Sequence, residues 1–379
     1  MICLSYDSFM DLCIQTGDEL LRVAQIDAEI SGFVTLDQLE EFLHIIDGIE
    51  ISFLDPNIQK MVDCVTKDPS LWPLLIPQSK RNEIISIAVR SIKAVLQDNS
   101  NREYLASWLE IRQFLDSLGR VRVAPKFWSQ LRQKYPAMSG PAFSPSILTN
   151  TLLKTTYTTA GTTTGRLTVT AGPNFLVTPT ESRKAIQSST ADSKIVIVDF
   201  SSMEPRVVLM AMGIPFDDRD IYQQLMQICD IDNRPAAKLA TISALYGASK
   251  MRLADTVGSQ RAAASLVENV RRFFGVEELE AKLELQFQTG VIRNFFGRPL
   301  HEAKQPRLRV NHFAQSTAAE LSILLFADLC KKVPVATPLL VIHDALIAEV
   351  PTVDLEHFKN ECQKISYQGY QFPTKMEVI

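Results

Sequence analysis

The stretch "KIVIVDFSSMEPR", residues 194–206, begins as an apolar strand and runs into a carboxylate, Asp199. Four consecutive branched apolar residues predict a strand that is buried on both faces. An aspartate at a strand end commonly bonds to the backbone of the following turn, so Asp199 alone indicates no chemistry. A second stretch, "LLVIHDALIAEV" (339–350), repeats the pattern, and its apolar run ends in His343 and Asp344. The pattern of an apolar run that ends in an aspartate therefore occurs twice in the chain.

The composition is that of an ordinary globular protein: 379 residues, of which 46% are hydrophobic and 22% charged. No run of 18 apolar residues predicts a membrane span, and the N-terminus lacks the charged region and apolar core of a secretion signal. The six cysteines are scattered without CxxC spacing. We therefore expect reduced thiols in a cytoplasmic protein, without a zinc site or a disulfide framework.

The net charge of −4 hides an uneven distribution. Residues 1–60 hold twelve Asp and Glu against two Lys and Arg, a balance of −10, so the rest of the chain carries +6. Within that rest, residues 231–310 hold thirteen basic and eight acidic residues. A basic segment of this kind permits a polyanionic partner without requiring one. The acidic N-terminal segment is typical of a solvated helix surface.

Hydrophobic periodicity separates a helical N-terminal region from a mixed remainder. Apolar residues recur every three to four positions in 82–97 and in 104–118, which predicts two amphipathic helices packed as a pair. Prolines and glycines interrupt the pattern from 121 to 150, which indicates a boundary near residue 150. Beyond it, helices and strands are segregated rather than alternating, as is typical of an α+β fold. There we expect helices over 204–212, 261–288 and 308–333, and a hairpin over 339–350.

A third stretch, "RPAAKLATISALYG" (234–247), predicts a helix that presents Arg234, Lys238, Ile242 and Tyr246 on one broad side. Two cations one turn apart can hold a polyphosphate, with Arg as a planar fork and Lys as a point charge. Cations at this spacing are also common on solvated helix faces, and a tyrosine at such a position is as often a core residue. The helix alone therefore does not predict a polyphosphate site. It becomes informative only together with the two strand-end aspartates.

In their order along the chain, these stretches resemble the polymerase domain of A-family DNA polymerases, the bacterial DNA polymerase I class. "DFSSMEPR" is similar to that family's motif A, "RPAAKLATISALYG" to motif B and "VIHDALIAEV" to motif C. "TTTGRLTVTAGPN", "VIRNFFGRPL" and "RLRVNHFAQSTAAEL" resemble other recurrent segments of the family. The resemblance covers about half the chain. It implies an α+β right-hand polymerase fold with an antiparallel-sheet palm, helical fingers and a divergent helical thumb.

The resemblance also implies how the chain is divided, although the thumb assignment rests mainly on position. Asp27 and Glu29 have the spacing of an exonuclease metal site, but we interpret this stretch as a helix surface. The stretch before motif A is too short for a thumb and a full proofreading exonuclease, so we expect no exonuclease in this chain. The expected parts are a thumb-like helical region (1–150), the first part of the palm (151–212), the fingers (213–290) and the second part of the palm (291–379).

In this family the reaction would be carried by Asp199 and Asp344, which would hold two Mg²⁺ ions. Phosphoryl transfer to a primer 3′-hydroxyl builds charge on the attacking, leaving and equatorial oxygens, which two divalent ions can neutralise. Magnesium takes oxygen ligands and keeps several waters, so two carboxylates with substrate phosphates suffice. Arg234 and Lys238 would hold the triphosphate, and Lys238 would also act on the leaving group.

The remaining family positions concern the sugar, the base and the DNA. Glu204 matches the steric gate that excludes a ribose 2′-hydroxyl, and Tyr246 and Ile242 would lie beside the base pair and the nucleotide. Donors in the minor groove meet acceptors that all correct base pairs share, so they test pair geometry without reading sequence. His343 matches a residue at the primer terminus, with a turn-shaping role as the alternative. The residues implied to contact DNA are Arg166, Arg307, Asn311, Gln315 and His343.

Four positions depart from the family pattern. Ala345 stands where motif C usually has a glutamate, which removes a helper carboxylate and predicts a lower metal affinity or rate. Ile242 stands where motif B usually has an aromatic ring, so stacking on the nucleotide is lost. Pro235 predicts that Arg234 lies at the helix end, and Pro205 stands at a position that is usually aliphatic. None of these changes removes an expected metal ligand, so we expect an active enzyme.

The sequence therefore predicts a compact template-directed DNA polymerase without proofreading, in the cytoplasm of a bacterial or phage-infected cell. Its expected partners are primer-template DNA and dNTPs, with a separate exonuclease, clamp or replication partner as further candidates and no membrane. One rival is a single-subunit RNA polymerase, against which Glu204 and the "TGRL" segment argue. The other is a catalytically idle nucleic-acid-binding subunit, which Ala345 and Ile242 would favour.

Overall fold

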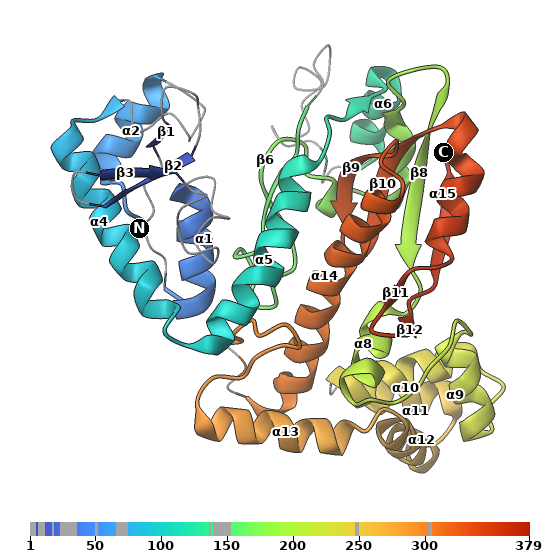
Figure 1. The fold of residues 1–379 in the computed structure, drawn as a ribbon. Helices are drawn as coiled ribbons and strands as arrows, with labels where there is room; N and C mark the ends of the chain where they lie inside the picture. Colours follow the sequence, from blue (N-terminus) through green and yellow to red (C-terminus); the bar gives the residue numbers. More distant parts are fainter. Residues whose placement is uncertain are drawn as a thin grey trace. The chain divides into compact units, whose positions relative to one another are not determined.

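A computed structural model describes most of the chain (Figure 1). The exonuclease-like spacing at Asp27 and Glu29 lies outside the described residues. Two compact units are present, Met1–Glu110 with Phe296–Pro299 and Ile111–Phe295 with Leu300–Ile379. The described residues are 5–6, 12–16, 19–22, 36–49, 52–65, 75–135, 138, 153–246, 250–301, 303 and 305–379.

The first unit combines a small sheet with helices. Three strands form an antiparallel sheet in chain order: β1 (Ser5–Tyr6), β2 (Leu12–Thr16) and β3 (Glu19–Arg22). The helices are α1 (Leu36–Asp47), α2 (Pro56–Val65), α4 (Gln78–Val95) and the first part of α5 (Asn99–Ser117). The strands correct the expectation of a purely helical N-terminal region. The two periodic helices are confirmed as α4 and α5, but α4 packs mainly against α1 instead of pairing with α5.

Aromatic rings form the core of this unit. Phe42 of α1 stacks on Tyr104 of α5 with ring centroids 6.0 Å apart and lies 5.3 Å from Trp108. All three side chains are fully buried. Arg298, from the distant segment Phe296–Pro299, donates a hydrogen bond of 3.0 Å to the hydroxyl of Tyr104. This segment therefore belongs to the first unit although the sequence on both sides of it belongs to the second.

The second unit is built on a four-stranded antiparallel sheet. The strand order is β13 (Thr374–Val378), β8 (Ser193–Phe200), β10 (Ala345–Pro351) and β9 (Thr337–Ile342). Helix, sheet and antiparallel pairing together confirm the expected α+β class.

The apolar run that precedes Asp199 is explained by burial on both faces of β8. Ile195 and Ile197 point into an apolar cluster that contains Trp128 and Phe175. Side chains alternate along a strand, so Phe200 faces the other way and stacks on Phe326 of α14 (Pro306–Lys332), with centroids 4.9 Å apart. A strand covered on both faces needs apolar residues at every position until it reaches the cavity at its end.

Helix α14 is long and apolar enough to pass a length and hydropathy test for a membrane span over Leu308–Lys332. However, 72% of that window is buried inside the protein. The helix packs against α8 (Met203–Ala211), α13 (Val276–Thr289) and the sheet. We therefore interpret it as a core helix.

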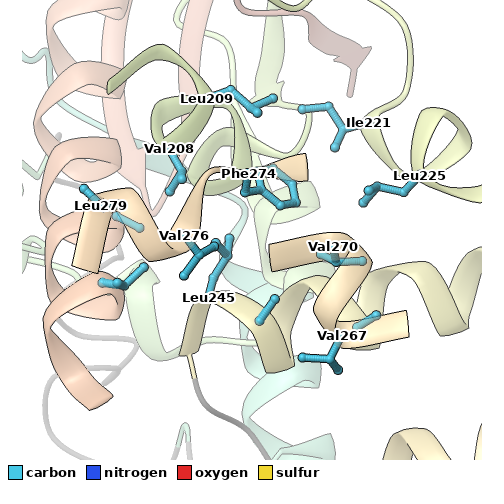
Figure 2. Close-up of a cluster of buried hydrophobic side chains, with 14 of the residues drawn as sticks. Val208, Leu209, Ile221, Leu225, Leu245, Val267, Val270, Phe274, Val276 and Leu279 are labelled. Carbon is cyan, nitrogen blue, oxygen red and sulfur yellow. The ribbon is translucent and has the colours of Figure 1, made fainter. Parts of the chain in front are cut away.

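A second apolar core is formed by the helices that lie, in sequence, between strands β8 and β9 (Figure 2). It is made by α9 (Ile221–Cys229), α10 (Arg234–Tyr246), α12 (Gln260–Phe273) and their neighbours. Helix α10 packs against α9, α11 (Lys250–Val257), α12 and α14. The residues labelled in Figure 2 are Val208, Leu209, Ile221, Leu225, Leu245, Val267, Val270, Phe274, Val276 and Leu279. Small alanines along α10 allow these helices to approach closely.

The remaining elements surround the sheet or connect it to the helices. In chain order they are β4 (Arg122–Val123), α6 (Pro125–Lys134), β5 (Thr156–Thr158), β6 (Thr168–Ala171), the 3₁₀ turns Phe175–Val177 and Thr180–Ala185, β7 (Ile186–Gln187), α11 (Lys250–Val257), the 3₁₀ turn Thr352–Asp354, α15 (Leu355–Cys362), β11 (Ser366–Tyr367) and β12 (Tyr370–Gln371).

Candidate active site

Asp199 and Asp344 lie together where β8 ends and the β9–β10 turn begins. Ala345, next to Asp344, pairs directly with Asp199 across the two strands. The amide of Phe200 donates a hydrogen bond of 3.2 Å to the carbonyl of Asp344, which joins the turn to β8. Both aspartates line one cavity of about 550 Å³. The sequence therefore correctly placed these two carboxylates at the ends of neighbouring antiparallel strands.

The electrostatics of this cavity favour a cation. Burial, and after it the charge of Asp344, raises the pKa of Asp199 to about 6, against the opposing charges of Arg183 and Lys375. Two carboxylates held this close are stabilised in their ionised form by a positive charge, and their oxygen donors suit a hard divalent ion. Among the described residues, no group of three or more His, Cys, Asp or Glu could hold a metal. Water and substrate oxygens would have to complete the coordination.

The backbone beside both aspartates adopts an unusual conformation. Ser202, at the start of α8, and His343, in the β9–β10 turn, both have φ of +57°. Non-glycine residues rarely enter this left-handed region, and they do so mainly where the surrounding structure imposes it, often at functional sites. In this site the two turns aim the strand ends into the cavity.

Glu204 lies in the first turn of α8 and faces the aspartates. It accepts a hydrogen bond from Arg166 Nη2 at 2.5 Å, so the expected sugar gate and an expected minor-groove residue form an ion pair. Burial raises the pKa of Glu204, with a contribution from Asp344, whereas Arg166 acts in the opposite direction. The carboxylate is thus held in a fixed position at the edge of the cavity.

Arg234 and Lys238 enter the same cavity from α10. Arg234 is the first residue of the helix, as Pro235 predicts. Its guanidinium pairs with Asp220 at 2.8 Å and lies 5.0 Å from the centre of the Tyr222 ring. Lys238 follows one turn later and is exposed. The helix thus presents one cation that the protein itself orients and one that projects into the open space.

The other two expected residues of α10 lie outside the lining of this cavity. Tyr246 is partly buried and packs against the apolar core of the neighbouring helices, which is the alternative that the sequence left open. Ile242 is also partly buried. In this structure, then, only the first two turns of α10 contribute to the cavity.

A smaller cavity of about 70 Å³ adjoins the first one and shares Glu204 and Asp344 with it. Its lining includes Arg166, Gln315 and His343, three of the residues expected to contact DNA. These side chains come from a loop, from α14 and from the β9–β10 turn, so the fold gathers residues that are far apart in the sequence.

Two further expected DNA contacts lie elsewhere on α14. Asn311 precedes Gln315 by one turn, and its buried Oδ1 has no hydrogen-bond partner among the described residues. Asn311 is not part of the lining of the small cavity. Arg307 lies in the first turn of α14, but its side chain is outside the described part of the chain.

Comparison with known proteins identifies the family. The sequence profile of DNA polymerase family A matches residues 99–378, most of the chain. The chain belongs to this family. DNA polymerase I of Chloroflexus aurantiacus is 27% identical over an alignment of 244 residues, and the match covers 54% of this chain and 25% of that protein. The match thus spans about a quarter of the length of this relative.

Within this family A domain, Arg206 is a site residue to which the sequence assigned no role. Its buried guanidinium donates hydrogen bonds to the carbonyls of Ser201 (3.1 Å), Asp217 (2.5 Å) and Arg219 (2.7 Å). It therefore ties the loop after Asp199 to the loop before α9. An arginine two residues after the glutamate of motif A looks like a ligand-binding residue, and only its hydrogen bonds reveal a structural role.

Other lining residues were also missed by the sequence reading. Asp220 caps α9 by accepting a hydrogen bond from the amide of Tyr222, a role that its position before a helix could have indicated. Its pairing with Arg234, fourteen residues away, has no sequence signal. Asp218 and Lys375 line the cavity as well. Lys375 lies on a strand that short-range patterns do not relate to motif A.

Proposed function

We propose that this family A chain is a template-directed DNA polymerase that adds dNTPs to a primer 3′-hydroxyl. The observation that carries the proposal is the pairing of Asp199 and Asp344 at the ends of neighbouring strands, in the same cavity as Arg234 and Lys238. Carboxylates on one side and cations on the other match the needs of phosphoryl transfer from a nucleoside triphosphate.

Asp199 and Asp344 would hold two Mg²⁺ ions, which when bound would activate the 3′-hydroxyl and neutralise charge on the leaving pyrophosphate. Lys238 is exposed and lines the cavity, so it would bind the polyphosphate and act on the leaving group. Arg234, fixed by Asp220, would orient the polyphosphate as a planar fork. Ala345 contributes no oxygen, so we expect weaker metal binding than a site with three carboxylates would have.

The surrounding residues would select the substrate. Glu204, fixed by Arg166, would occupy the space that a ribose 2′-hydroxyl needs. Gln315, Asn311 and His343 would contact the newly formed base pair and the primer end. In this proposal the sheet with α8 acts as the palm (151–212 and 291–379), the helices from α9 to α13 as the fingers (213–290) and the region 1–150 as the thumb.

Replacing either aspartate by asparagine tests the mechanism. Asp199→Asn and Asp344→Asn should each reduce primer extension on the order of 10³-fold, because the amide cannot replace the charge that holds the metal. Fluorescence anisotropy should show nearly unchanged affinity for primer-template DNA. Asp192→Asn serves as the matched control, because Asp192 is exposed and lies at the other end of β8, outside the cavity. Extension at the wild-type rate by either cavity variant would contradict the proposal.

The same assay separates this function from its rivals. A single-subunit RNA polymerase would incorporate rNTPs efficiently, and an idle nucleic-acid-binding subunit would bind primer-template without extending it. Running DNA and RNA templates side by side with dNTPs identifies the template class. A primer with a mismatched 3′ end tests the expectation that this chain carries no proofreading exonuclease, because proofreading would shorten that primer before extension.

A further inference from the structure

Lys375 lies beside the expected metal site on a strand that no motif covers. It belongs to β13, the edge strand that pairs with β8, and it stands directly opposite Asp199. Directly opposite residues of antiparallel strands project to the same face, and Lys375 lines the cavity together with Asp199 and Asp344. The amide of Ser201 donates a hydrogen bond of 2.9 Å to the carbonyl of Pro373. The start of β13 is therefore fixed against the loop that follows Asp199.

The charges around the cavity give Lys375 a distinct position. Four cationic side chains of described residues line the cavity, and two of them already have protein partners. Arg206 is held by three carbonyls, and Arg234 by Asp220. Lys238 and Lys375 form no ion pair within the part of the chain that the structure describes. One lysine approaches from the helix and the other from the sheet, so the aspartates have a cation on each side.

We propose that Lys375 binds the polyphosphate of the incoming nucleotide from the sheet side, opposite Lys238. This inference rests on the proposed function, because it takes the ligand of the cavity to be a nucleoside triphosphate. The triphosphate reacts next to Asp199 and Asp344, whose negative charges repel it. An ammonium group on the same sheet face offsets that repulsion and offers three donors to phosphate oxygens.

The row of side chains across the sheet supports this role. On the face that carries Asp199, its two cross-strand neighbours are Ala345 on β10 and Lys375 on β13. A small apolar residue thus stands on one side of the aspartate and a cation on the other. The palm face is therefore less negative than two or three carboxylates alone would make it, and it suits a polyanion.

The test measures nucleotide binding separately from chemistry. A primer that ends in a dideoxynucleotide forms a ternary complex with the enzyme, template and the next dNTP, but it cannot react. With Lys375→Met, which keeps most of the side-chain length and removes the charge, the dNTP concentration needed for half-saturation should rise about 10-fold. Lys375→Arg should restore most of the affinity. Inhibition of extension by pyrophosphate should weaken in parallel in Lys375→Met.

The controls distinguish this role from two others. Lys194→Met removes an exposed lysine at the opposite end of β8, outside the cavity, and should leave nucleotide affinity unchanged. Unchanged nucleotide affinity in Lys375→Met would overturn the inference. So would a loss confined to DNA affinity, which would indicate a DNA phosphate contact, or a change confined to the Mg²⁺ dependence, which would indicate that Lys375 only positions Asp199. A wild-type chain that neither extends a primer nor binds a dNTP would overturn the proposed function and this inference with it.

Discussion

The ion pair between Glu204 and Arg166 joins two residues for which we expect different roles in substrate binding. Glu204 would control access for the sugar, and Arg166 would contact the minor groove, yet their side chains bind each other at 2.5 Å. Arg166 is about half exposed, so the pair itself contributes little stability. Its effect is to hold the glutamate in one orientation between the two cavities.

We expect Glu204→Ala to raise ribonucleotide incorporation relative to deoxyribonucleotide incorporation by roughly 10- to 100-fold. Removing the carboxylate opens the space that a 2′-hydroxyl needs, whereas binding of the common parts of the nucleotide is retained. Single-nucleotide extension with dNTP and rNTP measures the ratio. Glu181→Ala, which removes a partly buried glutamate that pairs with Lys134 outside both cavities, is the matched control, and an unchanged ratio in Glu204→Ala would refute the gate assignment.

The ionised form of Asp199, which the proposed metal site requires, is disfavoured in the folded protein. Its pKa in the folded protein is about 6, above the ordinary value of 3.8, because burial and Asp344 disfavour the charge. The folded state therefore holds this proton more tightly than the unfolded state does. Between pH 3.8 and about pH 6, the free energy of unfolding therefore increases as the pH falls. Above pH 6, the ionised Asp199 lowers the free energy of unfolding.

In EDTA at pH 8, Asp199→Asn should therefore be more stable than the wild type by about 1–3 kcal/mol, although we expect this variant to be inactive. The difference should shrink as the pH approaches 4, where the wild-type aspartate is protonated. Urea denaturation at pH 8 and pH 5 measures both effects. Asp192→Asn, at an exposed site, should change neither value, and equal stability of wild type and Asp199→Asn at pH 8 would contradict the burial argument.

At the scale of elements, the helix over 204–212 and the hairpin over 339–350 were predicted from the sequence within one or a few residues. Both have strong local signals, since an apolar run ends at a polar turn in each case. The expected single helix over 261–288 is two helices, because Gly275 adopts φ of +62° between α12 and α13. One glycine in a continuous helical pattern gave no sufficient reason to expect a break.

The sequence predicted those residues of the site that belong to the recognised motifs. Asp199, Asp344 and Lys238 lie together as expected because each follows or belongs to an element with a clear sequence pattern. The partners that complete the cavity could not be predicted, since they depend on tertiary contacts. Asp220 reaches Arg234 only after α9 and α10 have packed, and the pairing of β13 with β8 joins segments that are far apart in sequence.

At the scale of the whole molecule, the chain forms two compact units, and the boundary expected near residue 150 stays a prediction. The units separate within α5, and a short segment from the second half of the chain completes the first unit. The assignment of the parts to thumb, palm and fingers stays a prediction that the division into two units leaves untested.

Gly297 anchors the short segment Phe296–Pro299 in the first unit. Its φ is +96°, and an added Cβ would meet the Ser100 carbonyl oxygen at 3.2 Å and Tyr104 Cβ at 3.3 Å. Gly297→Ala should therefore destabilise the first unit by about 1–3 kcal/mol, through both backbone strain and crowding. Hydrogen exchange should increase in α1 and in the first part of α5.

The control for this change is Gly258→Ala in the second unit. Gly258 also has a positive φ, +78°, but an added Cβ there would have no neighbour within 4 Å. It carries the backbone strain without the crowding, so its effect should be smaller and confined to the helices around α11 and α12. If Gly297→Ala instead increased exchange equally in β8 and β10, the two units would unfold as one, because a local clash would then be felt throughout the molecule.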